Sequence, residues 1–503
     1  MGKAAFAADF QATTYTASNQ LEPAVARAAN GDFVVVWGSG NQDGQFYGIF
    51  AQRFSSTGAR IAVEFQVNTY TTNAQRLPAV AMNDAGAFVV VWRSGSQDGS
   101  DYGVFGRRFS STGAGQGVEF QVNAYTTAAQ NVPAVAIDDQ GDFVVVWQGT
   151  GAAGAGIFGR RFGSNGGALA SDFKVNTSTL NGTRYPAVAS DADGDFVVTW
   201  DSRDQDGPSY GTFARRFDSL GVTTGGEFQV NTHTISDQFL STVAAADDGA
   251  FVVAWQSYHD GSGAGVFARR FSSSGAPLAV EFQVGQRTTL QQIRPSIDVA
   301  GDGAFLVAWT DSARDGSDYG VFGRRFDSTG AALSSDFQVN SYTLFEQRLP
   351  AVHLADDSAY VVAWHSPHDG FGFGVFATLK PALVTLDVDG DGTLAPLTDG
   401  LLVLRDHFGF SGSTLTNGAV DADCTRCDGP SVTAYINALG LQLDIDGNGS
   451  LDALTDGLLV LRNLFGFTGT TLTAAATGAG CTRCNAAQIE PYLNTLKTTP
   501  PTL

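Results

Sequence analysis

Two short acidic loops near the C-terminal end of the chain carry the oxygen-rich side chains that a hard cation needs. Each loop has acidic or amide side chains at positions one, three and five and a glycine at position six, and the second loop is a tandem copy of the first. Ca²⁺ prefers a large set of oxygen ligands arranged around such a flexible turn. The candidate ligands are Asp387, Asp389, Asp391, Thr393 and Asp399 in the first loop and Asp444, Asp446, Asn448, Ser450, Asp452 and Asp456 in the second.

These ligand sets predict about two Ca²⁺ ions, one in each loop, in preference to Mg²⁺. Thr393 and Ser450 at position seven would contribute backbone carbonyl oxygens. Position nine is Asp452 in the second loop and Ala395 in the first, where a water molecule would serve instead. A solvated acidic turn without an ion is the alternative interpretation, although carboxylates crowded into one turn repel one another unless a cation is present.

The acidic segment resembles the EF-hand-like calcium loops of bacterial dockerin modules. The resemblance rests on the pattern Asp-x-Asp-x-Asp/Asn-Gly, on an acidic residue that opens a leucine-rich helix, and on the tandem duplication. It implies a small helical calcium-binding domain. The segment departs from the family in two respects: Asp399 and Asp456 stand at position thirteen rather than twelve, and the repeat is longer because of a Cys-Thr-Arg-Cys insert.

The four cysteines of the chain all belong to two copies of this insert, which follow one another at the same spacing as the acidic loops. One zinc site built from both pairs and a thioredoxin-like redox pair are two interpretations of such motifs. Two local disulfides, each at the entry to a helix, suit an oxidising exterior best. The disulfide candidates are Cys424, Cys427, Cys481 and Cys484.

The rest of the chain is a seven-fold repeat, in which the tryptophans recur at an almost constant spacing. Each unit contains four short runs of β-branched and aromatic residues bounded by Gly, Asn, Asp or Ser, which is typical of strands joined by hairpins. Four-stranded units repeated seven times predict an all-β seven-bladed β-propeller over residues 1–380. A small α-helical EF-hand-like domain then covers residues 381–503. The tryptophans are Trp37, Trp92, Trp147, Trp200, Trp255, Trp309 and Trp364.

The two ends of the repeat predict a closed ring. The Phe-Gln-Val strand that ends each unit is missing after the seventh, whereas an orphan copy, Phe10-Gln11-Ala12, stands before the first. The N-terminal strand therefore completes the last blade, which leaves no exposed sheet edge at the seam.

One face of the ring carries long polar loops, and such loops on a rigid scaffold are favoured for binding. A near-ring of Asp-Gly pairs lies in these loops and offers carboxylates for cations or sugar hydroxyls. The alternative is that Asp-Gly simply suits a turn. The aspartates are Asp43, Asp98, Asp206, Asp260, Asp315 and Asp369; the third unit has Ala-Gly instead. The seventh unit breaks the symmetry with His353, His365 and His368. These histidines could form a metal or catalytic cluster, but surface loop residues are the favoured interpretation.

Charge and hydropathy limit the partners. There are 29 basic and 50 acidic residues, a formal net charge of −21, which disfavours nucleic acid. No run of eighteen apolar residues predicts a membrane span. The propeller repeats loosely resemble those of large secreted bacterial surface proteins, and this resemblance implies a secreted or cell-surface location.

Two functions follow from these features. The first is a calcium-binding adhesion protein whose long-loop face binds a glycan or a protein. The alternative is a secreted polysaccharide-active propeller enzyme with a calcium-dependent attachment domain. The sequence contains no nucleophile elbow, phosphate loop or isolated carboxylate pair. It therefore favours a protein without enzymatic activity.

Overall fold

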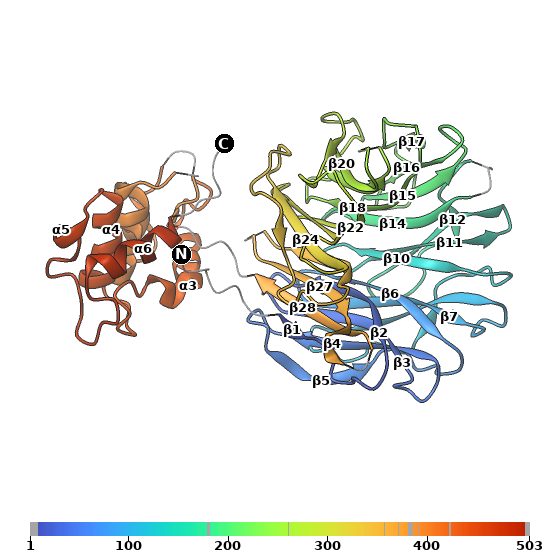
Figure 1. Ribbon diagram of the computed structural model, residues 1–503, viewed down its shortest axis with the longest axis horizontal. Helices are drawn as coiled ribbons and strands as arrows, with labels where there is room; N and C mark the ends of the chain where they lie inside the picture. The colour runs from blue at the N-terminus through green and yellow to red at the C-terminus, as the bar shows by residue number, and fades with distance from the viewer. Residues whose placement is uncertain are drawn as a thin grey trace. The chain divides into compact units, whose positions relative to one another are not determined.

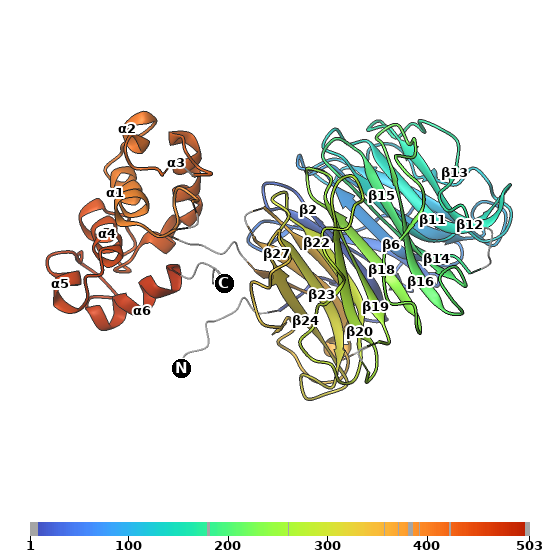
Figure 2. The same ribbon diagram turned by 90° about the horizontal axis from the view of Figure 1, so that it is seen from above.

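The computed structural model of the chain divides into two compact units, Met1–Ala382 and Leu383–Leu503. Each unit is described by itself (Figures 1 and 2). The residues that the structure describes are 9–178, 182–259, 261–356, 358–370, 372–380, 386–391, 393–421 and 424–497, without the side chains of 438 and 495.

The first unit is a seven-bladed β-propeller, which confirms the predicted fold class. Seven antiparallel sheets of four strands each form the blades. The innermost strands are β2 (Gln20–Arg27), β6 (Gln75–Met82), β10 (Asn131–Ile137), β14 (Arg184–Ser190), β18 (Gln238–Ala245), β22 (Gln292–Val299) and β26 (Arg348–Leu354). The second strands are β3 (Phe33–Gly40), β7 (Phe88–Gly95), β11 (Phe143–Gly151), β15 (Phe196–Arg203), β19 (Phe251–Ser257), β23 (Phe305–Ser312) and β27 (Tyr360–Ser366). The third strands are β4 (Tyr47–Phe54), β8 (Tyr102–Phe109), β12 (Gly154–Phe162), β16 (Tyr210–Phe217), β20 (Gly265–Phe271), β24 (Tyr319–Phe326) and β28 (Gly374–Lys380). The outermost strands are β5 (Arg60–Gln66), β9 (Phe120–Gln121), β13 (Phe173–Lys174), β17 (Phe228–Gln229), β21 (Phe282–Gln283), β25 (Phe337–Gln338) and β1 (Phe10–Gln11).

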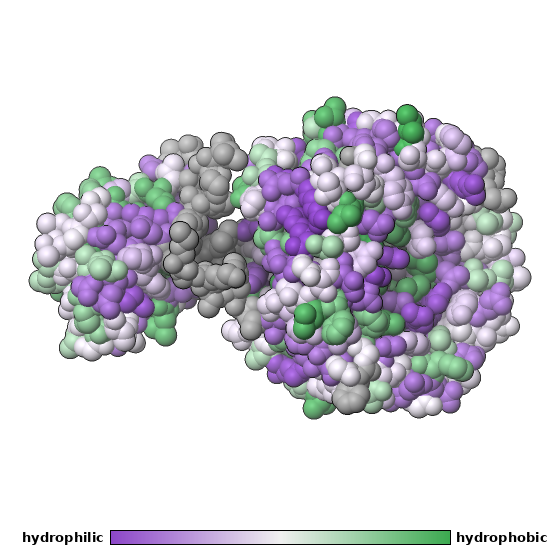
Figure 3. Space-filling model, in the orientation of Figure 1, coloured by the Kyte–Doolittle hydropathy of each residue, from purple (hydrophilic) through white to green (hydrophobic). Residues whose placement is uncertain are grey.

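The repeated aromatic residues form the core between neighbouring blades. All seven tryptophans are at most 1% exposed. Trp37 of the first blade packs with Val361 and Val375 of the seventh, so the same side chains stabilise a blade and its contact with the next. Burial of apolar area on this scale is the main favourable contribution to folding. On the face shown in Figure 3, exposed hydrophobic residues lie scattered among hydrophilic ones, as on an ordinary solvent-exposed surface.

Paired arginines on the third strands of the second to sixth blades, such as Arg107-Arg108 and Arg215-Arg216, make hydrogen bonds to neighbouring blades. The first arginine of a pair donates to a backbone carbonyl of the preceding blade, as Arg107 Nη1 does to Val67 O at 2.9 Å. The second reaches the following blade, as Arg216 Nη1 does to Ser274 O at 2.6 Å. These contacts occupy backbone acceptors at the blade junctions, where an unpaired polar group is costly.

The N-terminal strand β1 completes the seventh blade, in the order β1-β28-β27-β26. Phe10 pairs with Ala377. Asp9 Oδ2 accepts a hydrogen bond from Ser341 N at 2.6 Å, and Thr14 N donates to Glu64 Oε2 at 2.6 Å in the first blade. The first described residues of the chain therefore tie together the sixth, seventh and first blades.

Deleting residues 1–15 is expected to destabilise the whole ring. The deletion removes β1 and the packing of Phe10 on Phe54, whose ring centroids lie 5.2 Å apart. Loss of a packed phenylalanine alone costs about 3–5 kcal/mol. Thermal unfolding of the variant measures the effect, and deletion of residues 1–8 is the matched control because it keeps Asp9 and Phe10. An unchanged melting temperature of the longer deletion would contradict closure by this strand.

Buried acceptors hold the innermost strands, and one of them makes stability depend on pH. Leu240 lies in the left-handed region with a φ of 54°, and its N–H donates to Asp201 Oδ2 at 2.9 Å. Thr310 Oγ1 likewise accepts a hydrogen bond from Leu349 N at 3.3 Å. Asp201 is 0% exposed, and burial raises its pKa from 3.8 to about 7.

The Asp201 carboxyl group binds its proton more tightly in the folded protein than in the unfolded chain. The free energy of unfolding should therefore fall as the pH rises from about 4 to about 7. We expect Asp201→Asn to lack this fall, so that its stability relative to the unchanged protein increases between pH 5 and pH 8. Urea unfolding at the two pH values measures the difference. Gln148→Asn, at the equivalent position of the third blade, is the neutral control; equal pH dependence of both variants would contradict the assignment.

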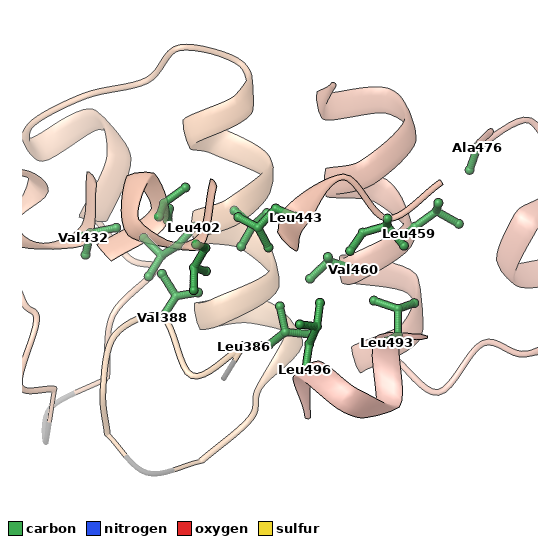
Figure 4. Close-up of a cluster of buried hydrophobic side chains, with 14 of the residues drawn as sticks. Leu386, Val388, Leu402, Val432, Leu443, Leu459, Val460, Ala476, Leu493 and Leu496 are labelled. Atoms are coloured by element: carbon green, nitrogen blue, oxygen red, sulfur yellow. The ribbon is translucent and has the colours of Figure 1, made fainter. Parts of the chain in front are cut away.

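The second unit is a pair of similar helical halves around one apolar core. Its helices are α1 (Leu401–His407), α2 (Ser413–Thr416), α3 (Gly429–Leu439), α4 (Leu458–Leu464), α5 (Gly469–Thr473) and α6 (Ala486–Leu496). Its shorter turns are η2 (Pro396–Gly400), η3 (Gly440–Leu443) and η4 (Ala453–Gly457); η1 (Pro367–Asp369) belongs to the propeller. The core includes Leu386, Leu402, Leu459 and Leu493 (Figure 4). The resemblance to EF-hand and dockerin modules is not confirmed, because the structure shows only short helices beside the acidic loops.

Candidate functional site

The acidic loops each bring three carboxylates together. One group is Asp387, Asp389 and Asp391, and in it the ligand atoms all lie within 4.8 Å of one another. The other, with the same spread, is Asp444, Asp446 and Asp456. Each group could hold a metal ion. The remaining candidates Thr393, Ser450 and Asp452 are exposed, and Asn448 Oδ1 accepts from Ser450 N at 2.8 Å. Gly392 lies outside the described residues.

The acid at position thirteen returns to its loop because a π-helical turn precedes each leucine-rich helix. The turns η2 and η4 take in the extra residue, as π-helical insertions do. Asp456 consequently accepts from Ile445 N at 2.6 Å and from Asp452 N at 2.9 Å. Asp399 accepts from Val388 N at 2.5 Å and Ala395 N at 2.8 Å. Burial raises the pKa of Asp399 to about 6, although these backbone hydrogen bonds oppose the rise.

The Cys-Thr-Arg-Cys motif holds the outside of each acidic loop. Cys424 and Cys427 form one disulfide, Cys481 and Cys484 the other, both with Cα atoms 5.4 Å apart. Between the cysteines, Arg426 Nε donates to Val388 O at 2.8 Å, and its guanidinium lies 3.9 Å from the Tyr435 ring. Arg483 repeats this arrangement with Ile445 O at 2.8 Å. Sequence reasoning did not identify the two arginines, although the repeat of the motif at the loop spacing was the signal.

The Asp-Gly ring of the long-loop face is built into the turns. Asp98 Oδ1 accepts from Ser100 N at 3.1 Å, and Asp206 Oδ2 accepts from Gln229 Nε2 at 2.8 Å. Their carboxylates therefore hydrogen bond within their own blades. Asp43, Asp315 and Asp369 stand at the same position of their blades, and Asp260 lies outside the described residues.

A cavity of about 490 Å³ occupies the propeller axis at the tight-turn ends of the innermost strands. Five blades place alanine at one position of this lining, but the sixth and seventh have Asp298 and His353 there. His353 Nδ1 lies 3.2 Å from Asp298 Oδ2. Burial raises the pKa of Asp298 and lowers that of His353, while the attraction between the two groups opposes both shifts.

Two further carboxylates face each other across Gly301 in the same cavity. Asp247 Oδ2 lies 2.5 Å and Asp356 Oδ1 3.1 Å from the place a Cβ atom on Gly301 would take. Asp356 Oδ1 accepts from Gly301 N at 2.6 Å. Burial, together with the charges of Asp356, Asp139 and Asp84, raises the pKa of Asp247. The arrangement sets a carboxyl group with a raised pKa beside a second carboxylate.

The three histidines of the seventh blade do not form a cluster. His353 lies in the axial cavity, whereas His368 stacks on Tyr342 with ring centroids 3.7 Å apart. His365 is 6% exposed, and burial lowers its pKa to about 4. Of the three, His353 alone is paired with a carboxylate in the described part of the chain.

Comparison with known proteins returns propellers. The α-L-arabinofuranosidase of Fusarium graminearum in complex with arabinobiose is 10% identical, and the alignment covers 75% of this chain and 97% of that one with a TM-score of 0.42. The α-L-arabinanase of Penicillium chrysogenum is 11% identical, with 75% and 98% covered and a TM-score of 0.44. The β-propeller domain of the Trilobed protease from Pyrococcus furiosus is 8% identical, with 70% and 90% covered and a TM-score of 0.42. No family model and no curated protein matches the chain.

The sequence-based preference for a protein without enzymatic activity is corrected by these matches, because two of these propellers are an arabinofuranosidase and an arabinanase. At such identities the likeness describes the fold alone, so a substrate and a mechanism must come from the residues of this chain. No helix among the described residues is long and apolar enough to cross a membrane.

Proposed function

We propose that the chain is a secreted enzyme that cleaves a glycan at the axial cavity of the propeller, with a calcium-binding C-terminal unit for attachment. The observation that carries the proposal is the pair of carboxylates around Gly301, one of which has a raised pKa. Glycosidases use two carboxyl groups with separate roles, an acid and a base or nucleophile. The two disulfides support an extracellular location.

The raised pKa suits Asp247 to the role of the acid. Asp247 would donate its proton to the glycosidic oxygen as the bond to the leaving sugar breaks. Asp356 would attack the anomeric carbon and form a covalent bond to it as the leaving sugar departs. Water, deprotonated by Asp247, would then attack the same carbon and break its bond to Asp356, so that the proton returns to Asp247. Both distances are measured from the same Cβ position on Gly301. The Asp247 and Asp356 oxygens can therefore be no further apart than the sum of 2.5 Å and 3.1 Å. This separation favours the retaining mechanism, whose carboxyl groups lie about 5–5.5 Å apart.

The pair lies at the tight-turn end of the axis and not among the long loops that the sequence favoured for binding. The carboxylate pair forms at the tight turns because the sixth blade has glycine at position 301. An acidic side chain from either neighbouring blade can approach the backbone there. Asp298 and His353 line the same cavity and would accept hydrogen bonds from sugar hydroxyls or donate hydrogen bonds to them.

Incubation of the full chain with arabinan, xylan, pectin, β-glucan and mannan, followed by measurement of released reducing ends, tests the proposal. We expect release from at least one polysaccharide and retention of configuration at the anomeric carbon by NMR. Absence of release from all five by folded, calcium-saturated protein would contradict a glycan-cleaving function.

The calcium proposal is supported by the two three-carboxylate groups and by the arginines that hold their loops. Two of the carboxylates, Asp389 and Asp446, are 0% exposed. Buried carboxylates are normally paired or coordinate a metal. Because the ligand set is oxygen and lies on a flexible turn, Ca²⁺ suits the loops better than Mg²⁺.

A further inference from the structure

The third blade differs from its neighbours in the connection between its second and third strands. Residues 41–46 and 96–101 form this connection in the first and second blades. In the third blade β11 ends at Gly151 and β12 begins at Gly154, so Ala152 and Ala153 alone join them. The Gln-Asp pair that the first, second and fourth blades carry in this connection is therefore missing.

In the longer connections this pair fills the space above the blade. Gln42 Nε2 donates to Glu64 Oε1 at 2.6 Å on the outermost strand of the first blade. In the fourth blade, Asp206 Oδ2 accepts from Asn231 Nδ2 at 3.1 Å as well as from Gln229. A connection with the pair thus supplies one hydrogen-bond donor and one carboxylate.

Two acceptors beside this short connection in the third blade have no hydrogen-bond partner among the described residues. Gln130 Oε1 is one, on a side chain that is 0% exposed. Asp172 Oδ1, which corresponds to the acceptor Glu64 Oε1, is the other; Arg160 Nε lies 3.8 Å away. Gly149 stands where most blades have serine, and a Cβ atom there would clash with Gln130 Oε1. A buried acceptor without a donor is costly, and its presence calls for an explanation.

A lysine takes the place of the missing aspartate. A Cβ atom on Gly156 would lie 2.6 Å from Lys174 Cε, whereas on the equivalent Gly103 it would lie 2.6 Å from Asp98 Oδ2. Lys174 Nζ donates to Ala153 O at 3.2 Å. An ammonium group with further N–H donors thus stands where other blades place a carboxylate.

These departures surround a cavity of about 380 Å³, a volume within the range of small-molecule sites. Its lining includes Gln130, Asp172, Lys174, Trp147 and Tyr125, which is 37% exposed. The cavity lies on the long-loop face, at the other end of the strands from the carboxylate pair across Gly301.

We propose that this cavity binds a single sugar unit of a glycan. Sugar hydroxyls both donate and accept hydrogen bonds, so one ring can serve the two acceptors and the ammonium group together. The opposite charges of Asp172 and Lys174 favour a neutral ring over an ion. Tyr125 offers an exposed aromatic ring for the apolar side of the sugar. The site stands independently of the proposed catalytic pair.

Saturation-transfer NMR on the full chain tests the proposal, with the methyl glycosides of glucose, galactose, mannose, xylose and arabinose as probes. We expect at least one probe to receive saturation. Lys174→Gln, which restores the residue of the other blades, should weaken its binding by about tenfold or more. A graft of residues 96–101 in place of 152–153 should abolish binding, because it returns the Gln-Asp pair to the blade.

Two controls keep the result specific. Gln229→Lys places a lysine at the same position of the fourth blade, where Asp206 remains to pair with it, and should create no new site. Asp247→Asn should keep the sugar signal, so failure of the proposed catalysis and failure of this site are distinguishable. No saturation of any probe, or equal saturation of the graft with an unchanged melting temperature, would overturn the proposal.

Discussion

We expect Asp247→Asn to reduce glycan cleavage by about 10²–10⁴-fold, the range by which a positioned acid accelerates such a reaction. The asparagine keeps the size of the side chain but has no proton to donate. Asp356→Asn should lose activity comparably, because an amide in place of this carboxylate would not attack the anomeric carbon. Initial rates on the polysaccharide that the unchanged enzyme cleaves measure both effects, with circular dichroism as the check on folding.

The pH profile separates an acid from a merely structural aspartate. Activity should fall as the pH rises through the pKa of Asp247, because the deprotonated acid cannot act. The charge of Asp139 helps to raise this pKa. Asp139→Asn should therefore move the basic limb of the profile to lower pH while most of the maximal rate remains. If Asp139→Asn were as damaging as Asp247→Asn, or if neither changed the rate, these two aspartates would not have the roles proposed.

The sequence predicted the propeller because each blade repeats the same short sequence motifs. The regularly spaced tryptophans, the Phe-Gln-Val strand and the Gly-containing hairpins each describe one four-stranded unit. Packing between blades then reuses these residues, as Trp37 does with Val361 and Val375. Seven repetitions made the pattern robust against any one departure from it, such as Ser241 in the place of the repeated proline.

The candidate catalytic pair escaped prediction for the same reason. Asp247 and Asp356 stand in turns that look alike in several blades, and nothing in their spacing shows that they meet. The departure lies in Gly301, whose backbone lets both acids approach. Asp298 and His353 offered a second signal, because they replace the alanine of five blades. Residues that differ from the repeat form a site only when the closed ring of seven blades brings them together at its axis.

The C-terminal loops were predictable as acidic turns but not in their detail. Counting from Asp444 puts Asp456 one place too far for the usual ligand position, and the structure accommodates this with the π-helical turn η4. The last residue of this turn, Gly457, lies close against Leu404 of α1, a contact that the sequence alone does not reveal. The part played by Arg483 was hidden because its hydrogen bonds go to backbone carbonyls far away in the sequence, such as that of Ile445.

Removal of calcium should destabilise the C-terminal unit while the propeller remains folded. Asp389 and Asp446 are 0% exposed, and without a cation their charges would repel the neighbouring carboxylates. An ion at one hundred times its dissociation constant stabilises the unit that binds it by about 2.7 kcal/mol for each site. Scanning calorimetry of EDTA-treated protein should therefore show one low-melting transition that moves upward as CaCl₂ is added.

Single-loop variants test whether the two loops act as separate sites. Isothermal titration of the unchanged chain should give about two ions, and Asp446→Ala should leave one, because the group around Asp389 is intact. Asp98→Asn, which alters an aspartate in a turn of the propeller, is the matched control and should keep both ions. If adding CaCl₂ produced no heat and no thermal shift, calcium at these loops would be ruled out. A shift produced equally by MgCl₂ would argue against Ca²⁺ as the preferred ion, since the smaller ion demands near-ideal octahedral geometry that a flexible turn supplies less well.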